Sequence, residues 1–215
     1  MLKLFYSPGA CSLAPHILLE ERGLDYQLEL VALAEGRQQS PEYLAINPKG
    51  RVPALLTGQG EVLTEVTAIS WYIAQQGAGP ALFPHDALLG ARCFEWFNWL
   101  TGTVHAVAFG QLWRPQRFIA EEALFPAVQS RGRENLQESF AFIERRLSGR
   151  HWAVGNAYTA ADPYLLVFYR WGNRIGMDMR AAYPRWSAHA ESVCGRPAVQ
   201  RALQQQGIVV WDKAA

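Results

Sequence analysis

Cysteine is scarce in this chain of 215 residues, with only Cys11, Cys93 and Cys194. Three cysteines so far apart argue against a disulfide framework and against a zinc cluster. The five histidines show no metal-ligand spacing either. We therefore predict no metal site.

Runs of basic residues and long apolar runs are also missing. Twenty basic and nineteen acidic side chains leave a formal charge of +1, and nucleic-acid binding needs clustered Lys and Arg. No apolar run approaches the roughly 18–20 residues that cross a bilayer. The first residues, Met-Leu-Lys-Leu-Phe, read as a strand and lack the pattern of a signal peptide. We expect a soluble cytoplasmic protein with no nucleic acid or membrane as partner.

The first eighty residues alternate strand and helix patterns. Strands are predicted at residues 2–6, 26–30, 52–56 and 61–64, the last two forming a hairpin around Gly58-Gln59-Gly60. Helices are predicted at residues 12–22, closed by Gly23, and at 65–76. The polar stretch before residue 52 is expected to be an irregular connection. These patterns indicate a small α/β domain over residues 1–80.

Beyond a linker at residues 77–86, only helical patterns occur, and we predict an all-helical domain over 87–215. One helix carries a stripe of apolar residues: Leu89, Cys93, Trp96, Leu100, Val104 and Val107. A second covers 121–147, and shorter helices lie around residue 186 and at 198–205. Another begins at Thr159-Ala160-Ala161-Asp162, a capping-box pattern in which the Thr hydroxyl would accept from free N–H groups.

Three features of the first domain could carry chemistry. Cys11 lies between a strand and a helix start, where the helix N-terminus lowers a thiol pKa; the alternative is a small buried residue. Val52 precedes Pro53, and a cis bond there would turn the backbone of Val52 toward a bound peptide; an ordinary edge-strand proline is the alternative. Glu65, at a helix start, could hold an ammonium group or simply cap the helix.

Longer stretches around these features resemble bacterial glutathione S-transferases, most closely the beta class. They are Lys3-Leu4-Phe5-Tyr6-Ser7-Pro8-Gly9-Ala10-Cys11-Ser12-Leu13-Ala14-Pro15-His16, Tyr43 to Leu55 with Asn47-Pro48-Lys49-Gly50-Arg51-Val52-Pro53, and Leu63-Thr64-Glu65. The resemblance covers the whole chain and implies a thioredoxin-like N-terminal domain plus an all-α C-terminal domain. It also implies a homodimer, and glutathione as co-substrate without a metal.

The resemblance implies roles for individual residues. Cys11 would lie beside the glutathione sulfur, with Ser12 and His105 helping to stabilise the thiolate. Val52, next to Pro53, would pair with the cysteinyl backbone. The remaining contacts would come from Glu65, Val66 and Thr67 at the γ-glutamyl end, and from Gln38 and Arg51 at the glycyl carboxylate. Val66 departs from the family's usual Ser or Gly at its position, and Ala106 replaces a lysine that often follows the histidine.

The helical domain is expected to hold a hydrophobic electrophile. Phe109 and Trp113 are spaced i,i+4, and Phe168 and Trp171 are spaced i,i+3. Such aromatic pairs line pockets but more often form plain core. Arg114, Arg117, Arg131 and Arg133 are interpreted as solvated helix surface.

The predicted activity is conjugation of the glutathione thiolate to hydrophobic electrophiles. One alternative is glutathione-dependent thiol–disulfide exchange through Cys11. Another is a non-catalytic, ligand-binding or regulatory member of the fold, which the missing hydroxyl at Val66 keeps open.

Overall fold

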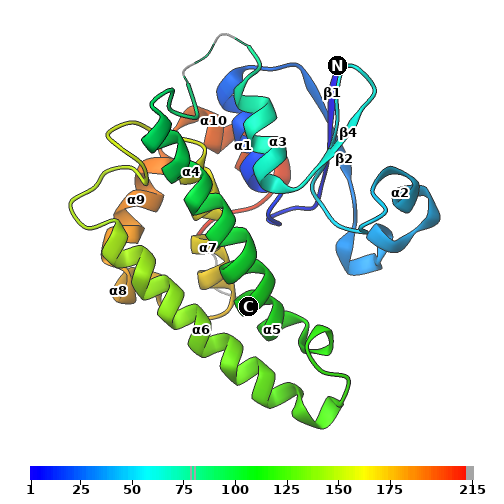
Figure 1. The fold of residues 1–215 in the computed structure, drawn as a ribbon, viewed down its shortest axis with the longest axis vertical. Coiled ribbons are helices and arrows are strands. Elements are labelled where there is room, and N and C mark those ends of the chain that lie inside the picture. Colours follow the sequence, from blue (N-terminus) through cyan, green and yellow to red (C-terminus); the bar gives the residue numbers. More distant parts are fainter. Residues whose placement is uncertain (78, 80, 212–215) are drawn as a thin grey trace.

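A four-stranded mixed sheet forms the N-terminal part of the computed structural model, which describes residues 1–77, 79 and 81–211 (Figure 1). The strand order is β2-β1-β3-β4. Strand β1 (Leu2–Tyr6) runs parallel to β2 (Tyr26–Leu30) and antiparallel to β3 (Ala54–Leu56), which pairs with β4 (Val62–Thr64). The α/β prediction, including the hairpin, is confirmed.

Helices α1 (Leu13–Arg22) and α3 (Val66–Ala74) lie together on one side of the strands. On the other side, the stretch expected to be irregular contains two 3-10 turns, η1 (Leu33–Glu35) and η2 (Arg37–Gln39), and the helix α2 (Pro41–Ile46). The Ser40 hydroxyl caps α2 by accepting from the backbone N–H of Tyr43. Ser followed by Pro is a helix start signal, so this short helix was detectable.

The rest of the described chain is helical. Its helices are α4 (Ala87–Trp99), the π-helical η3 (Leu100–Phe109), α5 (Gly110–Trp113), α6 (Phe125–Arg146), α7 (Ala161–Arg174), α8 (Met179–Ala182), α9 (Pro184–Cys194) and α10 (Pro197–Gln206), with 3-10 turns η4 (Pro115–Arg117) and η5 (Glu122–Leu124). The all-helical prediction is confirmed. None of the helices described combines the length and apolar character that a bilayer crossing requires.

The π-helical segment changes which side chains face the core. Helices α4, η3 and α5 follow one another without a break, but Gly110 N–H donates to the carbonyl of His105, five residues earlier. Such wider turns shift the phase of an apolar stripe. The middle of the predicted stripe is buried, whereas Val107 is 40% exposed and Phe109 is fully buried. The prediction for Val107 was therefore wrong, and Leu89 at the other end is also exposed.

Two other helix starts differ from expectation. The helix predicted from residue 121 begins at Phe125, after the turn η5. At the start of α7, the Thr159 hydroxyl donates to Asp162 Oδ2, and the same oxygen accepts from Thr159 N–H. The carboxylate, and not the Thr hydroxyl, is thus the acceptor at this capping box.

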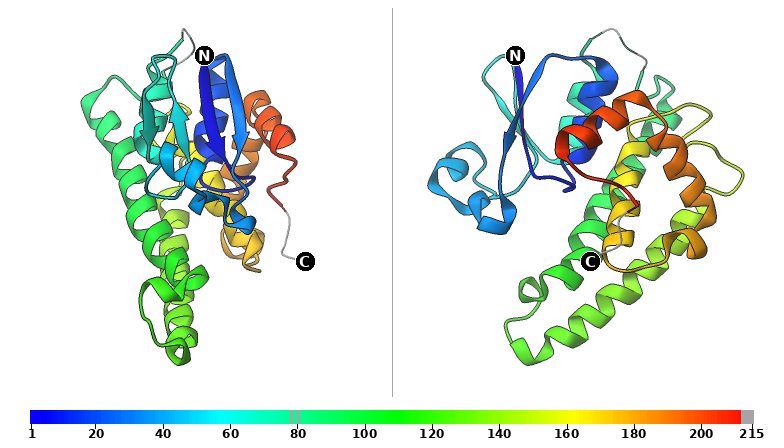
Figure 2. Two further views of the ribbon diagram at one scale, coloured as in Figure 1. Left: turned by 90° about the vertical axis from the view of Figure 1, so that its right-hand side faces the viewer. Right: turned by 180° about the vertical axis from the view of Figure 1, so that it is seen from behind.

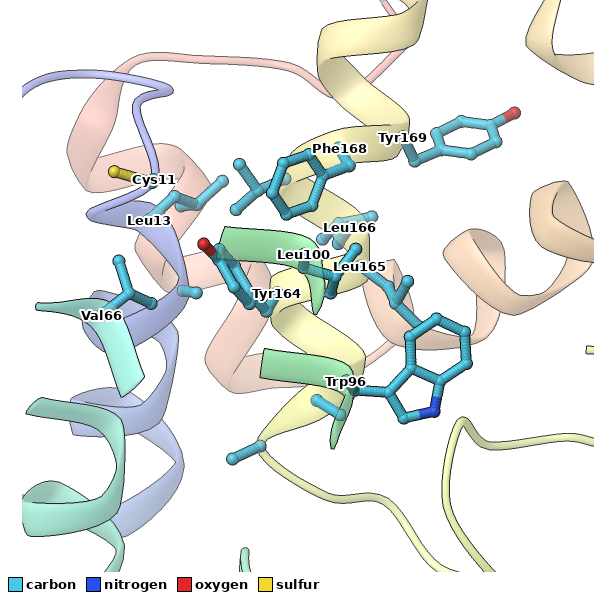
Figure 3. Packing of buried hydrophobic residues seen from close by; sticks show 14 of the residues in the cluster. Cys11, Leu13, Val66, Trp96, Leu100, Tyr164, Leu165, Leu166, Phe168 and Tyr169 are labelled. Carbon is cyan, nitrogen blue, oxygen red and sulfur yellow. The ribbon is translucent and has the colours of Figure 1, made fainter. Parts of the chain in front are cut away.

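One hydrophobic core joins the two parts of the molecule. Figure 3 shows Leu13 and Val66 of the α/β part facing Tyr164 and Phe168 of α7. Every residue of α7 from Ala161 to Asn173 is buried, so this helix is the centre of the helical part. Seen from behind, α10 lies beside α1 (Figure 2). The loop between β1 and α1 is consequently held by elements from both parts.

Candidate active site

The loop from Ser7 to Ser12 carries the first candidate residue, Cys11, and is closed by its own hydrogen bonds. Ser12 Oγ accepts from Ser7 N–H and donates to the carbonyl of Ser7, both at 3.2 Å. Ser12 is fully buried. Its hydroxyl is therefore occupied in shaping the loop, which differs from the expected direct role beside the glutathione sulfur.

Gly9, two residues before Cys11, is held by the helical part. Its N–H donates to Gln206 Oε1 at 2.9 Å, and its carbonyl accepts from Trp171 Nε1 at 2.8 Å. Its φ of +66° is unfavourable for other residues, and an added Cβ would lie 2.3 Å from Arg170 Nη1. The left-handed backbone favours glycine here, and helices α7 and α10 fix the position of the Cys11 loop.

Cys11 lies at the start of α1, with its side chain buried. Its Sγ donates to the carbonyl of Val52 at 3.4 Å. Burial raises the pKa of the Cys11 thiol to about 12, although the backbone N–H groups of Cys11 and Ser12 act in the opposite direction. The expectation that the helix N-terminus makes Cys11 a thiolate is therefore wrong for this structure: desolvation outweighs the backbone dipoles, and the thiol is protonated near neutral pH.

The Val52–Pro53 peptide bond is cis, as the functional interpretation of this pair required. The carbonyl of Arg51 accepts from the Tyr43 hydroxyl at 2.7 Å and from Asn47 Nδ2 at 2.6 Å. These two bonds anchor the loop before β3. Val52 is half-buried at the end of this loop, next to the Cys11 thiol.

Glu65 is the one non-glycine residue with positive φ in the described chain, at +72°. It stands at the N-cap of α3, and its Oε1 accepts from Lys49 Nζ at 2.6 Å. Its side chain is exposed, so it can meet a ligand ammonium group. Lys49 could not be predicted as the partner of Glu65, because residues 16 apart carry no periodic signal.

Val66 and Thr67 open α3, where the first backbone N–H groups have no acceptor within the helix. The Val66 side chain is 5% exposed and packs in the core. Only its N–H is available to a ligand. Thr67 is half-buried and lines a cavity together with Glu65.

That cavity, of about 700 Å³, lies between α3 and α4. It is lined by Leu63, Glu65, Thr67, Ala68, Trp71, Tyr72, Phe94, Asn98, Thr101 and Gly102. The sequence carries no pattern that predicts this cavity, because α3 and α4 each look like ordinary amphipathic helices. None of the four predicted electrophile-pocket residues lines it.

His105 is half-buried in η3 and packs its ring against Trp171 at 4.8 Å and Phe168 at 6.2 Å between ring centroids. Burial, followed by the charges of Arg114, Arg51 and Arg117, lowers the pKa of His105 to about 4. The imidazole is therefore neutral at physiological pH and supplies no positive charge.

The predicted aromatic pocket is mostly core. Phe109 and Phe168 are fully buried and Trp171 is 6% exposed, whereas Trp113 is 45% exposed. The Trp113 ring packs against Phe109 at a tilt, with ring centroids 4.5 Å apart, and edge-on against Trp171 at 5.1 Å. The structure brings the four residues together, but Trp113 alone among them offers a large exposed surface.

Gln38 and Arg51 come from separate loops. Gln38 lies in η2, and its Oε1 is buried without a hydrogen-bond partner among the described residues. Arg51 is exposed, and its charge acts on His105 across the two parts of the molecule. Arg114 acts on both Cys11 and His105. Arg114 and Arg117 are solvated as predicted, but they stand beside the candidate site.

Two family models match this chain. The family model "Glutathione S-transferase, N-terminal domain" matches residues 9–76, and "Glutathione S-transferase, C-terminal domain" matches residues 119–197. Glutathione S-transferase GstA of Escherichia coli O157:H7 is 35% identical over 209 residues, covering 96% of this chain and all of the relative.

Two solved structures extend the likeness to the whole fold. A glutathione transferase homologue from Sulfitobacter with bound glutathione has a TM-score of 0.90 and 33% identity, covering 97% of this chain and 99% of that one. A beta-class glutathione S-transferase from Sphingomonas chungbukensis has a TM-score of 0.84 and 35% identity, covering 96% and 100%.

Proposed function

This chain belongs to the glutathione S-transferase family and is a glutathione transferase, and we propose the roles that its own residues take in that reaction. Glutathione would lie along the edge made by the Cys11 loop, the Val52–Pro53 loop and the start of α3. The observation that carries this proposal is the 3.4 Å contact of Cys11 Sγ with the carbonyl of Val52, which joins the two loops at the position expected for the cysteinyl residue.

The γ-glutamyl end would bind at the start of α3. The Glu65 carboxylate would accept from its ammonium group, and the backbone N–H groups of Val66 and Thr67 would donate to its carboxylate. Lys49 now pairs with Glu65, so glutathione binding would exchange this exposed ion pair for a ligand contact. Val66 contributes no hydroxyl, which predicts weaker binding than a Ser at the same position gives.

The glycyl carboxylate would face the Arg51 guanidinium. The amide of Gln38 would serve the adjoining peptide, where its unpaired buried oxygen can accept from an N–H group. The cysteinyl backbone would pair with the backbone of Val52, in the manner of an added strand.

The glutathione sulfur would then lie near Cys11, His105 and Arg114. A protonated Cys11 can donate to the thiolate, as can the N–H of neutral His105. Arg114 provides the positive charge that His105 lacks. Together these groups favour the thiolate, which is the nucleophile.

The reaction needs no further group from the protein. The thiol proton leaves to solvent, and the sulfur lone pair forms a carbon–sulfur bond at the electrophilic carbon. The leaving group departs with the electrons of the bond that breaks.

Calorimetric titration of the reduced protein with glutathione tests the binding site. We expect one glutathione per subunit, with affinity reduced at least about tenfold in Glu65→Gln, which loses a charged hydrogen bond. Asp178→Asn, which alters an exposed cap on α8, is the matched control and should bind normally. Absence of saturable binding up to millimolar glutathione would overturn the proposal.

Cys11→Ala distinguishes transfer from thiol–disulfide exchange. A thiol with a raised pKa is a poor attacking group in exchange, so we expect Cys11→Ala to retain part of the conjugating activity. Complete loss of conjugation in this variant, with glutathione binding intact, would assign the covalent chemistry to Cys11.

We also propose that the chain forms a homodimer through the face around the α3–α4 cavity. Trp71 and Phe94 line this cavity and are 47% and 37% exposed, and Leu88 nearby on α4 is 65% exposed. A second copy would cover this apolar surface. Light scattering should give twice the chain mass, and Phe94→Arg should halve it; Leu124→Arg, at an exposed apolar residue of η5, is the control.

The remaining proposals concern organisation. We propose that residues 1–80 form the glutathione-binding domain and residues 87–215 the electrophile-binding domain of a cytoplasmic enzyme. The boundary at residue 80 falls outside the described residues. Limited proteolysis is expected to cut between the two ranges, whereas cuts confined to other loops would move the boundary.

A further inference from the structure

Arg114 and Arg117 project from one tight turn at the end of the long helix. Arg114 leaves helical geometry with φ −145° and ψ 57°, while its N–H still donates to the carbonyl of Gly110 at 2.8 Å. Arg117 N–H donates to the carbonyl of Arg114 at 3.0 Å, and Pro115 between them is buried. The turn is thus fixed by its backbone, and it presents two guanidinium groups at its surface.

These guanidinium groups have no acidic partner in the part of the chain that the structure describes. Among the described residues, no ion pair or side-chain hydrogen bond involves Arg114, Arg117 or the nearby Arg51. Several other exposed arginines have acidic partners, as Arg131 has Glu134, whereas Arg133, Arg150 and Arg174 form no ion pair among the described residues. What distinguishes Arg114 and Arg117 is that their charges act on His105 in the candidate site and that exposed aromatic rings flank their turn.

The three positive charges also act on one another. Burial first, and then the charges of Arg114 and Arg51, lower the pKa of Arg117. Burial first, and then the charges of the same three arginines, lower the pKa of His105. Like charges repel, and an anion bound beside Arg117 would relieve the repulsion that Arg114 and Arg51 exert on it.

Exposed aromatic surface adjoins the turn. Trp113, immediately before Arg114, is 45% exposed, and its ring rests on Phe109 and Trp171. Phe118, immediately after Arg117, is 43% exposed, and its ring packs close to Gly110, where an added Cβ would lie 3.3 Å from it. A planar apolar ring can therefore lie on this surface with a charged substituent directed at the guanidinium groups.

We propose that the electrophile-binding side of this site is built for aromatic electrophiles that carry a carboxylate or a similar anionic substituent. Arg117 is the residue that recognises the anion, with Trp113 and Phe118 contacting the ring. This inference rests on the proposed transferase function and goes further, because hydrophobic electrophiles alone give no use for unpaired guanidinium groups. Arg51 stays with the glycyl carboxylate and Arg114 with the thiolate, which leaves Arg117 for the substrate.

A matched pair of electrophiles tests this proposal. A chlorodinitrobenzoate and the corresponding chlorodinitrobenzamide have the same ring and leaving group, and differ in charge. In both reactions a carbon–sulfur bond forms and chloride leaves with the electrons of the carbon–chlorine bond. Each kcat/KM is divided by the uncatalysed rate constant with glutathione, which removes the difference in intrinsic reactivity.

We expect the wild-type enzyme to prefer the benzoate. Arg117→Gln should lower the benzoate-to-benzamide ratio about fivefold, the size expected of one partly solvated charged contact. Arg117→Lys should keep part of the preference because it keeps the charge. The control is Arg150→Gln, which removes an equal charge at the far end of α6, a helix about 33 Å long.

The alternative outcomes have distinct meanings. An unchanged ratio in Arg117→Gln would overturn the proposal. A raised KM for glutathione with an unchanged ratio would also overturn it, because Arg117 would then serve the glutathione carboxylate. An equal fall of the benzoate-to-benzamide ratio in Arg150→Gln would also overturn it, because the preference would then come from the overall charge of the protein.

Two further results separate this proposal from the transferase assignment. Conjugation of both electrophiles without preference for the benzoate would refute the anion site and leave the transferase function standing. Conjugation of neither, together with no calorimetric binding of glutathione, would refute the transferase function and this inference with it. The preference should also decrease as salt is raised from about 0.02 M to about 0.3 M, because screening weakens charge recognition.

Discussion

Substitution of Asp162 by Asn should destabilise the protein strongly without touching the active site. The Asp162 carboxylate is fully buried at the start of α7. Its Oδ1 accepts from Ala153 N–H at 2.8 Å and from His189 Nε2 at 2.8 Å, and its Oδ2 accepts from Thr159 N–H at 2.6 Å and from Thr159 Oγ1 at 3.1 Å. One side chain therefore ties three segments together.

The cost follows from the lost acceptor. An Asn oxygen can keep one pair of these donors, but its NH₂ group would face the other pair. The Thr159 hydroxyl can rotate to accept, whereas a buried backbone N–H facing another donor costs about 1.5–3 kcal/mol. The hydrogen bonds that the neutral amide keeps are also weaker than those of the carboxylate. We therefore expect the free energy of unfolding to fall by about 3 kcal/mol. For a chain of this length, that lowers Tm by about 6–12 °C.

Thermal unfolding followed by circular dichroism, at fixed protein concentration, measures this shift. Asp178→Asn is the control, because Asp178 caps α8 from an exposed position and Asn caps equally well. Glutathione affinity of folded Asp162→Asn should match the wild type. A decrease in Tm below about 3 °C would refute the assignment of the carboxylate as the central acceptor.

The remaining predictions concern the site itself. Burial gives His105 a folded-state pKa of about 4 against an ordinary 6.5, so the unfolded chain binds the proton more readily and the free energy of unfolding falls as pH drops from 6.5 toward 4. We expect a loss of about 2 kcal/mol for this half-buried ring and no such loss in His105→Gln. Urea unfolding across this pH range measures the difference. Equal acid sensitivity of both proteins would contradict the burial argument. Val66→Thr keeps the branched shape and adds a hydroxyl at the start of α3, so KM for glutathione should fall about threefold; an unchanged KM would show that the hydroxyl does not reach the ligand. Trp171→Phe removes the 2.8 Å hydrogen bond to the carbonyl of Gly9 and should lower Tm by about 2–4 °C, which calorimetry detects. An unchanged Tm would contradict this prediction and show that water replaces the lost donor.

Local patterns explain which parts of the fold were predictable. Strands such as Leu2–Tyr6 combine an apolar run with a following Ser-Pro-Gly turn, and helix α1 ends at Gly23 with left-handed geometry. These signals are contained within a few residues. The π-helical η3 has no such signal, because its wider turns arise from packing, and the exposure of Val107 could not be read from spacing.

In the candidate site, too, local patterns predict some features and tertiary packing determines the others. Cys11, Val52 and Glu65 stand at element boundaries, where motif and resemblance both locate them. The protonation of Cys11 depends on how deeply it is buried in the fold, and the effect of the Arg117 charge on His105 depends on how the chain turns after Trp113. Both are results of tertiary packing, which a single sequence does not encode in any local pattern.

The two hydrogen bonds from the helical part to Gly9 have a consequence for protein engineering. Both backbone groups of this residue, two positions before the thiol, are satisfied by Gln206 and Trp171. A chimera that joins this α/β part to a relative's helices would keep the sequence of the Cys11 loop from this chain. The side chains that hold the loop would come from the relative, so the relative would set the geometry of the loop. Recombination between such enzymes should therefore succeed when residues 171 and 206 travel with the loop that they hold.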